Sequence, residues 1–269
     1  MRIRFLFIHF LLISSVCLSQ QFQGKAVYLS KTKFEFDFGA RKVPEDAKKK
    51  MQERMDKAME KNFVLSFNKV ASIYEAEVKL DGPKEGGGRG AMFASIMGGP
   101  SIGTSYKNVS DKESKRAVEF FGKNFLIQDP LKPFAWKLEN DIKRIGKYTC
   151  FKATTYIEKK QNPFAKDRDS LSTETLVTVW YTPEIPVSLG PDKYWGLPGL
   201  ILSVNAGDTQ IICTKVVLNV EAKKEIKAPK KGKKVTEEEF EKIVADKTVE
   251  LRERFKNRKP GGGRGKGPR

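Results

Sequence analysis

Hydrophobic and polar residues alternate along much of the chain between residues 22 and 220. In residues 32–38 three phenylalanines alternate with charged residues, and residues 73–80 alternate in the same way. A period of two gives a strand one apolar and one polar face. Similar short runs, separated by Gly, Pro, Asn and Asp, cover residues 25–30, 62–68, 116–122, 124–129, 134–139, 147–157, 174–182, 200–206 and 209–220.

This succession of short strands, with few helical segments between them, predicts a mainly β fold. We expect a strongly curved antiparallel sheet, forming a partly open β-barrel-like meander, with a β-sandwich as the alternative architecture. The predicted β-rich domain covers residues 20–221, and the sequence shows no internal repeat.

One helical pattern interrupts the strands. Residues 44–61 begin with Pro44, carry acidic residues in the first turn and space Met51, Met55 and Met59 four residues apart. Proline at a first helical position and this spacing predict a charged helix with a narrow apolar stripe. We expect this helix to be inserted between two strands and to lie across the sheet.

A second helical pattern lies near the C-terminus. Thr236 and Glu239 have the spacing of a capping box, and apolar residues follow at helical intervals, which predicts a C-terminal helix over residues 236–257. Residues 222–235 before it and 258–269 after it are basic, and we interpret them as a solvated linker and a disordered Gly-rich tail.

The first residues have the pattern of a secretory signal peptide. Residues 1–19 begin with two arginines, continue as an uncharged apolar stretch and end on small residues, which predicts cleavage and export to the periplasm or outer envelope. Cleavage removes His9, the single histidine of the chain. The mature chain then lacks the imidazole needed for a Ser-His-Asp triad, a Cys-His pair or a histidine metal site.

Charge is unevenly distributed. The full chain has 51 basic and 33 acidic residues, a net charge of +18. Residues 222–269 contain 17 basic and 8 acidic residues, so half of the excess belongs to the C-terminal region. For an exported chain we expect this tail to contact an anionic surface rather than nucleic acid. A long Gly-rich loop, residues 82–103, is either functional or disordered.

Two cysteines remain after cleavage. Cys150 and Cys213 lie in predicted strands, each on the face opposite to the more apolar one. If those strands are neighbours, an oxidising compartment would allow a disulfide between them. The alternatives are two free, half-buried thiols or a reactive pair, although neither residue begins a predicted helix or lies in a C-x-x-C motif.

The run Gly196-Leu197-Pro198-Gly199-Leu200-Ile201 places turn residues inside an apolar stretch. Proline followed by glycine fits a type II turn, in which Pro198 fixes one φ angle and Gly199 supplies a positive one. Leu197 and Leu200 would leave this turn on a buried side. We interpret the run as a buried structural corner, with the lining of a binding cleft as the alternative.

The same run resembles the signature of the GLPGLI family of exported Bacteroidota proteins. Residues 136–154 resemble the family's tryptophan followed by a Gly-Tyr-x-Cys-x-Lys-Ala strand, with Lys147 inserted before the tyrosine, and residues 179–202 resemble its central block. The resemblance implies a mostly β envelope protein. It implies no activity and no catalytic residues.

Candidate chemistry is sparse. Carboxylate pairs that would serve a hydrolase are Glu139 with Asp141, Asp167 with Asp169, and Glu174 with Glu184. A Ser-Lys dyad has no supporting motif. The methionines Met51, Met55 and Met59 form a weak candidate copper site, because thioethers bind Cu(I). The aromatic residues that could line a ligand site are Trp136, Trp180, Tyr181 and Trp195.

By elimination, the sequence favours a non-enzymatic binding or accessory module of the envelope, for an apolar ligand or a protein partner. A carboxylate-dependent hydrolase, a methionine-based copper-binding protein and a purely structural assembly component are the alternatives. We expect no cofactor and no transmembrane span.

Overall fold

A computed structural model describes residues 22–33, 44–77, 103–158, 174–220 and 225–256. The predicted signal peptide, the predicted strand at residues 34–38, almost all of the Gly-rich loop and the C-terminal tail lie outside these ranges. The elements, in chain order, are β1 (Gln23–Thr32), α2 (Glu45–Ala58), β2 (Glu60–Asn68), β3 (Ala71–Ala76), β4 (Thr104–Asn108), β5 (Glu113–Phe120), β6 (Lys123–Pro130), β7 (Lys137–Ile145), β8 (Tyr148–Glu158), β9 (Glu174–Thr182), β10 (Leu200–Ala206), β11 (Thr209–Leu218), β12 (Lys233–Val235) and α4 (Glu237–Lys256).

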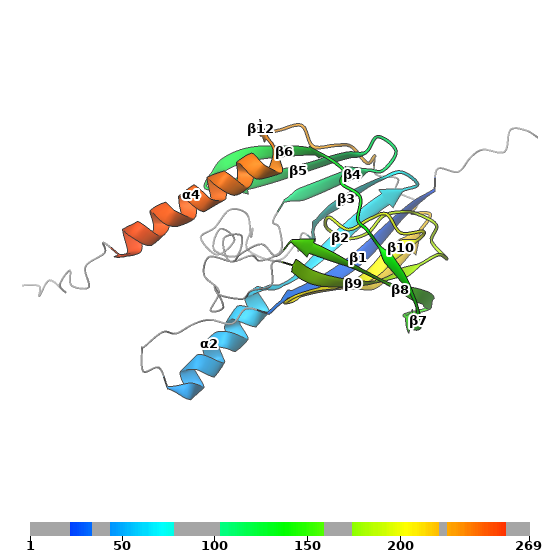
Figure 1. The fold of residues 1–269 in the computed structure, drawn as a ribbon, viewed down its shortest axis with the longest axis horizontal. Coiled ribbons are helices and arrows are strands. Elements are labelled where there is room, and N and C mark those ends of the chain that lie inside the picture. The colour runs from blue at the N-terminus through cyan, green and yellow to red at the C-terminus, as the bar shows by residue number, and fades with distance from the viewer. Residues whose placement is uncertain (1–21, 34–43, 78–102, 159–173, 221–224, 257–269) are drawn as a thin grey trace, which may run out of the picture.

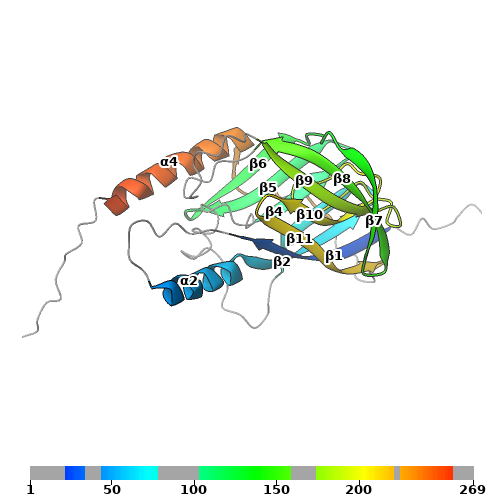
Figure 2. The ribbon, with the colours of Figure 1, turned by 60° about the horizontal axis from the view of Figure 1, so that its bottom comes forward.

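Within the described residues, all twelve strands form one sheet in the order β12-β6-β5-β4-β3-β2-β1-β11-β10-β9-β8-β7. Every pairing is antiparallel except that of β12 with β6. The sheet is strongly twisted and curved, and its edge strands β12 and β7 are not paired with each other (Figures 1 and 2). The prediction of a mainly β, curved and largely antiparallel sheet with two helices is confirmed.

The main core lies on one face of the sheet, which we call the inner face. It combines Tyr28 of β1 and Phe63, Leu65 and Phe67 of β2 with residues of β8 to β11 and of the loop between β9 and β10. Along β1 these side chains alternate with half-buried ones, and in β2 Phe63 and Leu65 flank the half-buried Val64. The period-two pattern in the sequence therefore reports which face is buried.

Helix α2 is where predicted but not placed as predicted. It covers Glu45–Ala58, yet it projects from the end of the sheet beside β2 and does not lie across it (Figure 1). Met51 remains 42% exposed, whereas Met59, just after the helix, is buried. A helix this rich in charge has too narrow an apolar stripe to cover a sheet face.

The C-terminal segment wraps around the β6 edge of the sheet. Ile226 and Ala228 pack on Ala71, Ile73 and Tyr106, whose side chains lie on the outer face. The chain then forms β12 beside β6 and continues as α4, which packs on the inner face. Part of the region interpreted from sequence as a solvated linker is thus a strand of the sheet.

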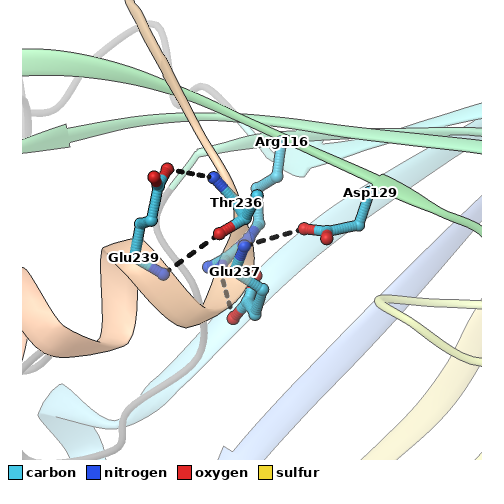
Figure 3. A network of polar contacts seen from close by, with 5 residues as sticks. All are labelled: Arg116, Asp129, Thr236, Glu237 and Glu239. Atoms are coloured by element: carbon cyan, nitrogen blue, oxygen red, sulfur yellow. Dashed lines mark hydrogen bonds and ion pairs between the residues drawn. The ribbon is translucent and has the colours of Figure 1, made fainter.

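Helix α4 is fixed at its first turn. Thr236 Oγ1 accepts a hydrogen bond from the Glu239 backbone N–H (3.2 Å), and Glu239 accepts one from the Thr236 N–H (2.9 Å), which confirms the predicted capping box (Figure 3). Arg116 of β5 binds both carboxylate oxygens of Glu237, and Asp129 of β6 accepts the Glu237 backbone N–H. Strand residues therefore satisfy helix groups that would otherwise be unpaired.

A small second core lies under this helix. Phe240 contacts Phe120 and Phe125 edge to face, and Val118, Ile127 and Val235 complete the cluster. Neither helix of the described part of the chain has the length and apolar character needed to cross a membrane.

Candidate functional site

The GLPGLI run (residues 196–201) ends a loop that packs into the main core. This loop joins β9 to β10, and its residues Ile185, Val187, Leu189 and Leu197 are at most 2% exposed. The backbone N–H groups of Leu200 and Ile201 bond back to Ile185 and Leu189. The loop therefore fills the inner face, and Leu197, Gly199, Leu200 and Ile201 of the run are buried while Gly196 and Pro198 are exposed.

The corner is not the type II turn that the sequence suggested. Gly199 does not have a positive φ, which instead occurs at Gly196 (+95°). The Gly199 N–H donates to the Leu197 carbonyl (2.8 Å), so the turn spans three residues around Pro198. Gly199 is required for another reason, because an added Cβ would lie 2.2 Å from the Thr182 carbonyl oxygen.

A buried lysine anchors the same loop. Lys107 of β4 is 2% exposed and its Nζ donates to the carbonyls of Gly190 (2.7 Å), Asp192 (2.5 Å) and Tyr194 (2.9 Å). An ammonium group has three donors, and each one has a carbonyl acceptor here. Burial lowers the pKa of Lys107 to about 7, while the nearby charge of Asp192 acts in the opposite direction.

Lys107 and Ser72 face each other across β3 and β4, as the members of a Ser-Lys dyad would. Ser72 is fully buried, and its Oγ has no hydrogen-bond partner in the described structure. No substrate could reach a pair sealed from solvent in this way, and the lysine already holds three carbonyls. The arrangement positions the loop and is not equipped for nucleophilic catalysis.

The four candidate ligand-lining aromatics do not form one site. The Trp136 indole donates to the Trp195 carbonyl (2.8 Å), and the Trp195 indole donates to the Lys132 carbonyl (3.0 Å), so these two lie together at the end of β7. Trp180 is half-buried and packs against the main core, and Lys143 is 4.1 Å from its ring centre. Tyr181, next in the strand, points inward and is buried.

The two carboxylate pairs within the described residues are not arranged as the acid and base of a hydrolase. Glu139 and Asp141 both bind Lys152, at 2.9 and 3.1 Å, and hydrogen bonds from Lys152 and Thr154 lower the pKa of Glu139. A general acid needs the opposite shift. Glu174 and Glu184 lie at opposite ends of β9, and Glu184 accepts the Thr149 backbone N–H. Asp167 and Asp169 lie outside the described residues.

Of the states that the sequence left open for the two cysteines, the structure has the free thiols and not the disulfide. Cys150 and Cys213 are free, and β9 and β10 lie between their strands, so the condition for pairing is not met. Cys150 is completely buried in the main core rather than on a polar face, and Cys213 is half-buried.

The candidate copper site is not assembled by the described side chains. Met51 is solvent-exposed on α2 and Met59 is buried beyond its end, while the Met55 side chain lies outside the described part.

The edge strand β7 carries the most accessible apolar side chains near the loop. Leu138 is 57% and Ile142 is 60% exposed, and they pair with Ala153 and Phe151 of β8. The register shift between them adds residues to β7 and lets Glu139 and Asp141 converge on Lys152. We call Trp136, Leu138, Ile142, Arg144 and Trp195 the edge surface.

Residues 136–203 match the model of a family described as "Protein of unknown function (Porph_ging)". The matched region begins at Trp136, includes β7, β8 and β9, and contains the whole GLPGLI run. No curated protein matches the chain.

Two solved structures of PNGF-II, in C2 and P21 space groups, show a distant likeness. They are 12% and 13% identical to this chain, each with a TM-score of 0.49, over 83% and 84% of its length. The chain spans about a third of either PNGF-II chain (33%), and a likeness this weak carries no inference about function.

Sequence reasoning found part of this site. It singled out Trp136, Trp195 and the GLPGLI run, but it missed Lys107, because β4 has no apolar alternation and lysine is rarely buried. It also missed the edge surface, because strand order depends on long-range pairing that no local pattern reports.

Proposed function

We propose that this chain is a non-enzymatic binding module that holds a protein partner at the edge surface of its sheet. The observation that carries the proposal is the contrast between a filled inner face and an accessible edge. Leu197, Leu200 and Ile201 are at most 1% exposed, whereas Leu138 and Ile142 of the edge strand are more than half exposed.

The filled interior favours a partner over a small apolar ligand. A ligand pocket requires a hollow lined by apolar side chains. In the described part of the chain, the loop between β9 and β10 packs into the place that such a hollow would need, Lys107 holds its carbonyls, and Tyr28 bonds to the start of β10. The Tyr28 hydroxyl donates to the Ile201 carbonyl (2.7 Å).

A non-enzymatic role is supported by how the polar groups are used. The carboxylates of Glu139 and Asp141 are both ion-paired with Lys152, and the buried Lys107 is bonded to backbone carbonyls. These pairings hold strands and loops together. The groups are not free to move protons on a bound substrate.

We place this module in the cell envelope, after removal of residues 1–19. The pattern of a signal peptide and the resemblance to the GLPGLI family support this location. A partner would then be another exported or membrane-associated protein.

Site-specific photo-crosslinking in the native host tests the proposal. A photoreactive phenylalanine analogue is introduced at Ile142 and, as a matched control, at Val70, which is 42% exposed in the turn between β2 and β3. We expect a discrete polypeptide adduct at position 142 and none at position 70. Absence of an adduct at 142, or equal adducts at both positions, would refute a partner at this edge.

A further inference from the structure

The geometry points to an extended, acidic segment of the partner as the occupant of the edge surface, added to the sheet as a strand beside β7. This inference rests on the proposed function and names the chemistry of the partner. It is carried by backbone geometry, by charge and by the two locked tryptophans.

The backbone of β7 has one paired side. β7 is the last strand of the sheet, and no described strand lies beyond it. It joins β8 through Gly146 and Lys147, with Gly146 at φ +58° as in a two-residue hairpin turn of type II′. Because hydrogen-bonded and non-bonded pairs alternate from the closing pair Ile145–Tyr148, the backbone groups of Ile142 and Arg144 point away from β8. An extended chain can bond to them.

The charge along this edge selects the partner. Lys137, Lys143 and Arg144 are exposed on β7, and Lys147 follows in the turn. The acidic residues of the strand, Glu139 and Asp141, are both paired with Lys152. The remaining charge is positive, which repels basic strands and favours an acidic one. Lysines on an edge strand also disfavour pairing with most other strands. An acidic strand is the exception, because the same lysines attract it.

The side chains of the edge surface add apolar anchors. Leu138 and Ile142 of β7 each have more than half of their surface exposed. Trp136 and Trp195 stand at the N-terminal end of the strand, half-buried, with each indole fixed by a hydrogen bond to a carbonyl. Rigid aromatic residues lose little entropy on binding and dominate many interfaces. The occupant therefore alternates acidic and apolar residues.

The test uses the mature chain, residues 20–269, and synthetic peptides of about eight residues, the length of a typical strand. The first peptide alternates glutamate with valine. The second carries lysine in place of glutamate, and the third repeats the first with methyl groups on alternate backbone nitrogens. Binding is measured by isothermal titration at low and at high salt.

We expect the acidic peptide to bind, and its N-methylated form to bind at least about tenfold more weakly because the strand hydrogen bonds are blocked. The lysine peptide should not bind. Arg144→Glu in the protein should weaken the acidic peptide, whereas Lys69→Glu, in the exposed turn between β2 and β3, should not.

Three outcomes would overturn the inference. Equal binding of the methylated and unmethylated peptides would show that charge alone acts, without strand addition. A second outcome is that the acidic peptide fails to bind although position 142 still crosslinks to a polypeptide in the host. That result would support the proposed function and refute an acidic strand as the occupant. Self-association through β7, seen by analytical ultracentrifugation and lost on Arg144→Glu, would identify a second copy as the occupant instead.

Discussion

At the scale of single residues, Lys107 determines where the loop before the GLPGLI run lies. Its three hydrogen bonds reach carbonyls of residues 190, 192 and 194. An apolar residue of the same length would fill the space but leave those carbonyls without donors. The lysine is therefore a structural hydrogen-bond donor inside the sheet, supplied by a strand whose sequence gives no sign of burial.

Lys107→Met should destabilise the protein strongly. Each orphaned buried carbonyl costs about 1 to 3 kcal/mol, so we expect the free energy of unfolding to fall by about 3 kcal/mol or more. Urea denaturation followed by tryptophan fluorescence measures this change. Lys69→Met, in an exposed turn, is the control and should be close to neutral. Equal stability of the two variants would contradict the assigned role.

The titration of Lys107 gives a second test through pH. Burial lowers its pKa from 10.5 to about 7, so between these values the unfolded chain binds one proton more than the native chain. Unfolding then takes up a proton, and raising the pH over this window should stabilise wild type relative to Lys107→Met. Parallel stability curves for the two proteins from pH 7 to 10 would show that the lysine titrates normally.

Gly199 is required by space and not by backbone angle. An added Cβ would lie 2.2 Å from the Thr182 oxygen, so Gly199→Ala should lower the free energy of unfolding by more than about 2 kcal/mol. Gly199→Asn should be at least as damaging, although asparagine tolerates a positive φ. Gly146→Ala, with φ +58° and open space around it, should cost about 1 to 2 kcal/mol. If Gly199→Asn lowered the free energy of unfolding only slightly, the result would favour the type II turn over the three-residue turn around Pro198.

At the scale of elements, the C-terminal segment is a separate attachment to the sheet. Helix α4 rests on its own small core, held by Phe240, Arg116 and Asp129. This core involves β5, β6 and β12, while the main core gathers the strands and the loop around the GLPGLI run. Two cores of unequal size favour local opening of the smaller one.

Phe240→Ala should release α4 without unfolding the main core. Truncating a buried phenylalanine costs about 3 to 5 kcal/mol, which exceeds what a helix attached through a few contacts can tolerate. Hydrogen exchange should show faster exchange in α4 and β12 and unchanged exchange in β1, β2 and β9. Val249→Ala, on an exposed side chain of the same helix, should change neither region. Uniform loss of protection would mean one cooperative unit.

The sequence predicted elements well where alternation was strong. Residues 174–182 and 200–206 form β9 and β10 with the predicted bounds. It missed β4, β12 and the second half of β7, whose residues are mostly polar. β12 and β7 lie at the edges of the sheet, and β4 receives its apolar neighbours from distant segments. The capping box was readable because the two side chains that form it are three residues apart. The direction of α2 could not be predicted, because the apolar stripe of this helix makes few contacts with the sheet.

At the scale of the whole molecule, one curved sheet encloses a loop, and no covalent cross-link is required between its halves. Burial raises the pKa of Cys150 to about 11 and of Cys213 to about 12, so both thiols stay protonated at neutral pH. Protonated thiols attack disulfides slowly.

Reducing agent should therefore leave the stability of the protein unchanged. We expect the same Tm with and without dithiothreitol, and two free thiols per mature chain by titration after denaturation. A bridge between Cys150 and Cys213 would instead stabilise by roughly 4 kcal/mol in the chain-entropy model and shift the Tm by several degrees.

The candidate site could be predicted only in part from the sequence, because its contacts join residues that are far apart along the chain. Trp136 and Trp195 stood out as residues, but their contact depends on a hydrogen bond from the Trp136 indole to the Trp195 carbonyl, across 59 positions. Lys107 reaches its acceptors across more than 80 positions. The exposure of Leu138 and Ile142 follows from β7 being the edge strand, which is set by the order of all the strands.

The central claim is that the chain binds a polypeptide at the edge surface and holds no small molecule in its interior. Native mass spectrometry of protein isolated from its host's envelope measures this directly. We predict the mature chain in complex with a second polypeptide, and loss of that complex when both Leu138 and Ile142 are replaced by aspartate. A mature chain that carries a lipid, a metal or another small ligand, with no polypeptide bound, would contradict the account.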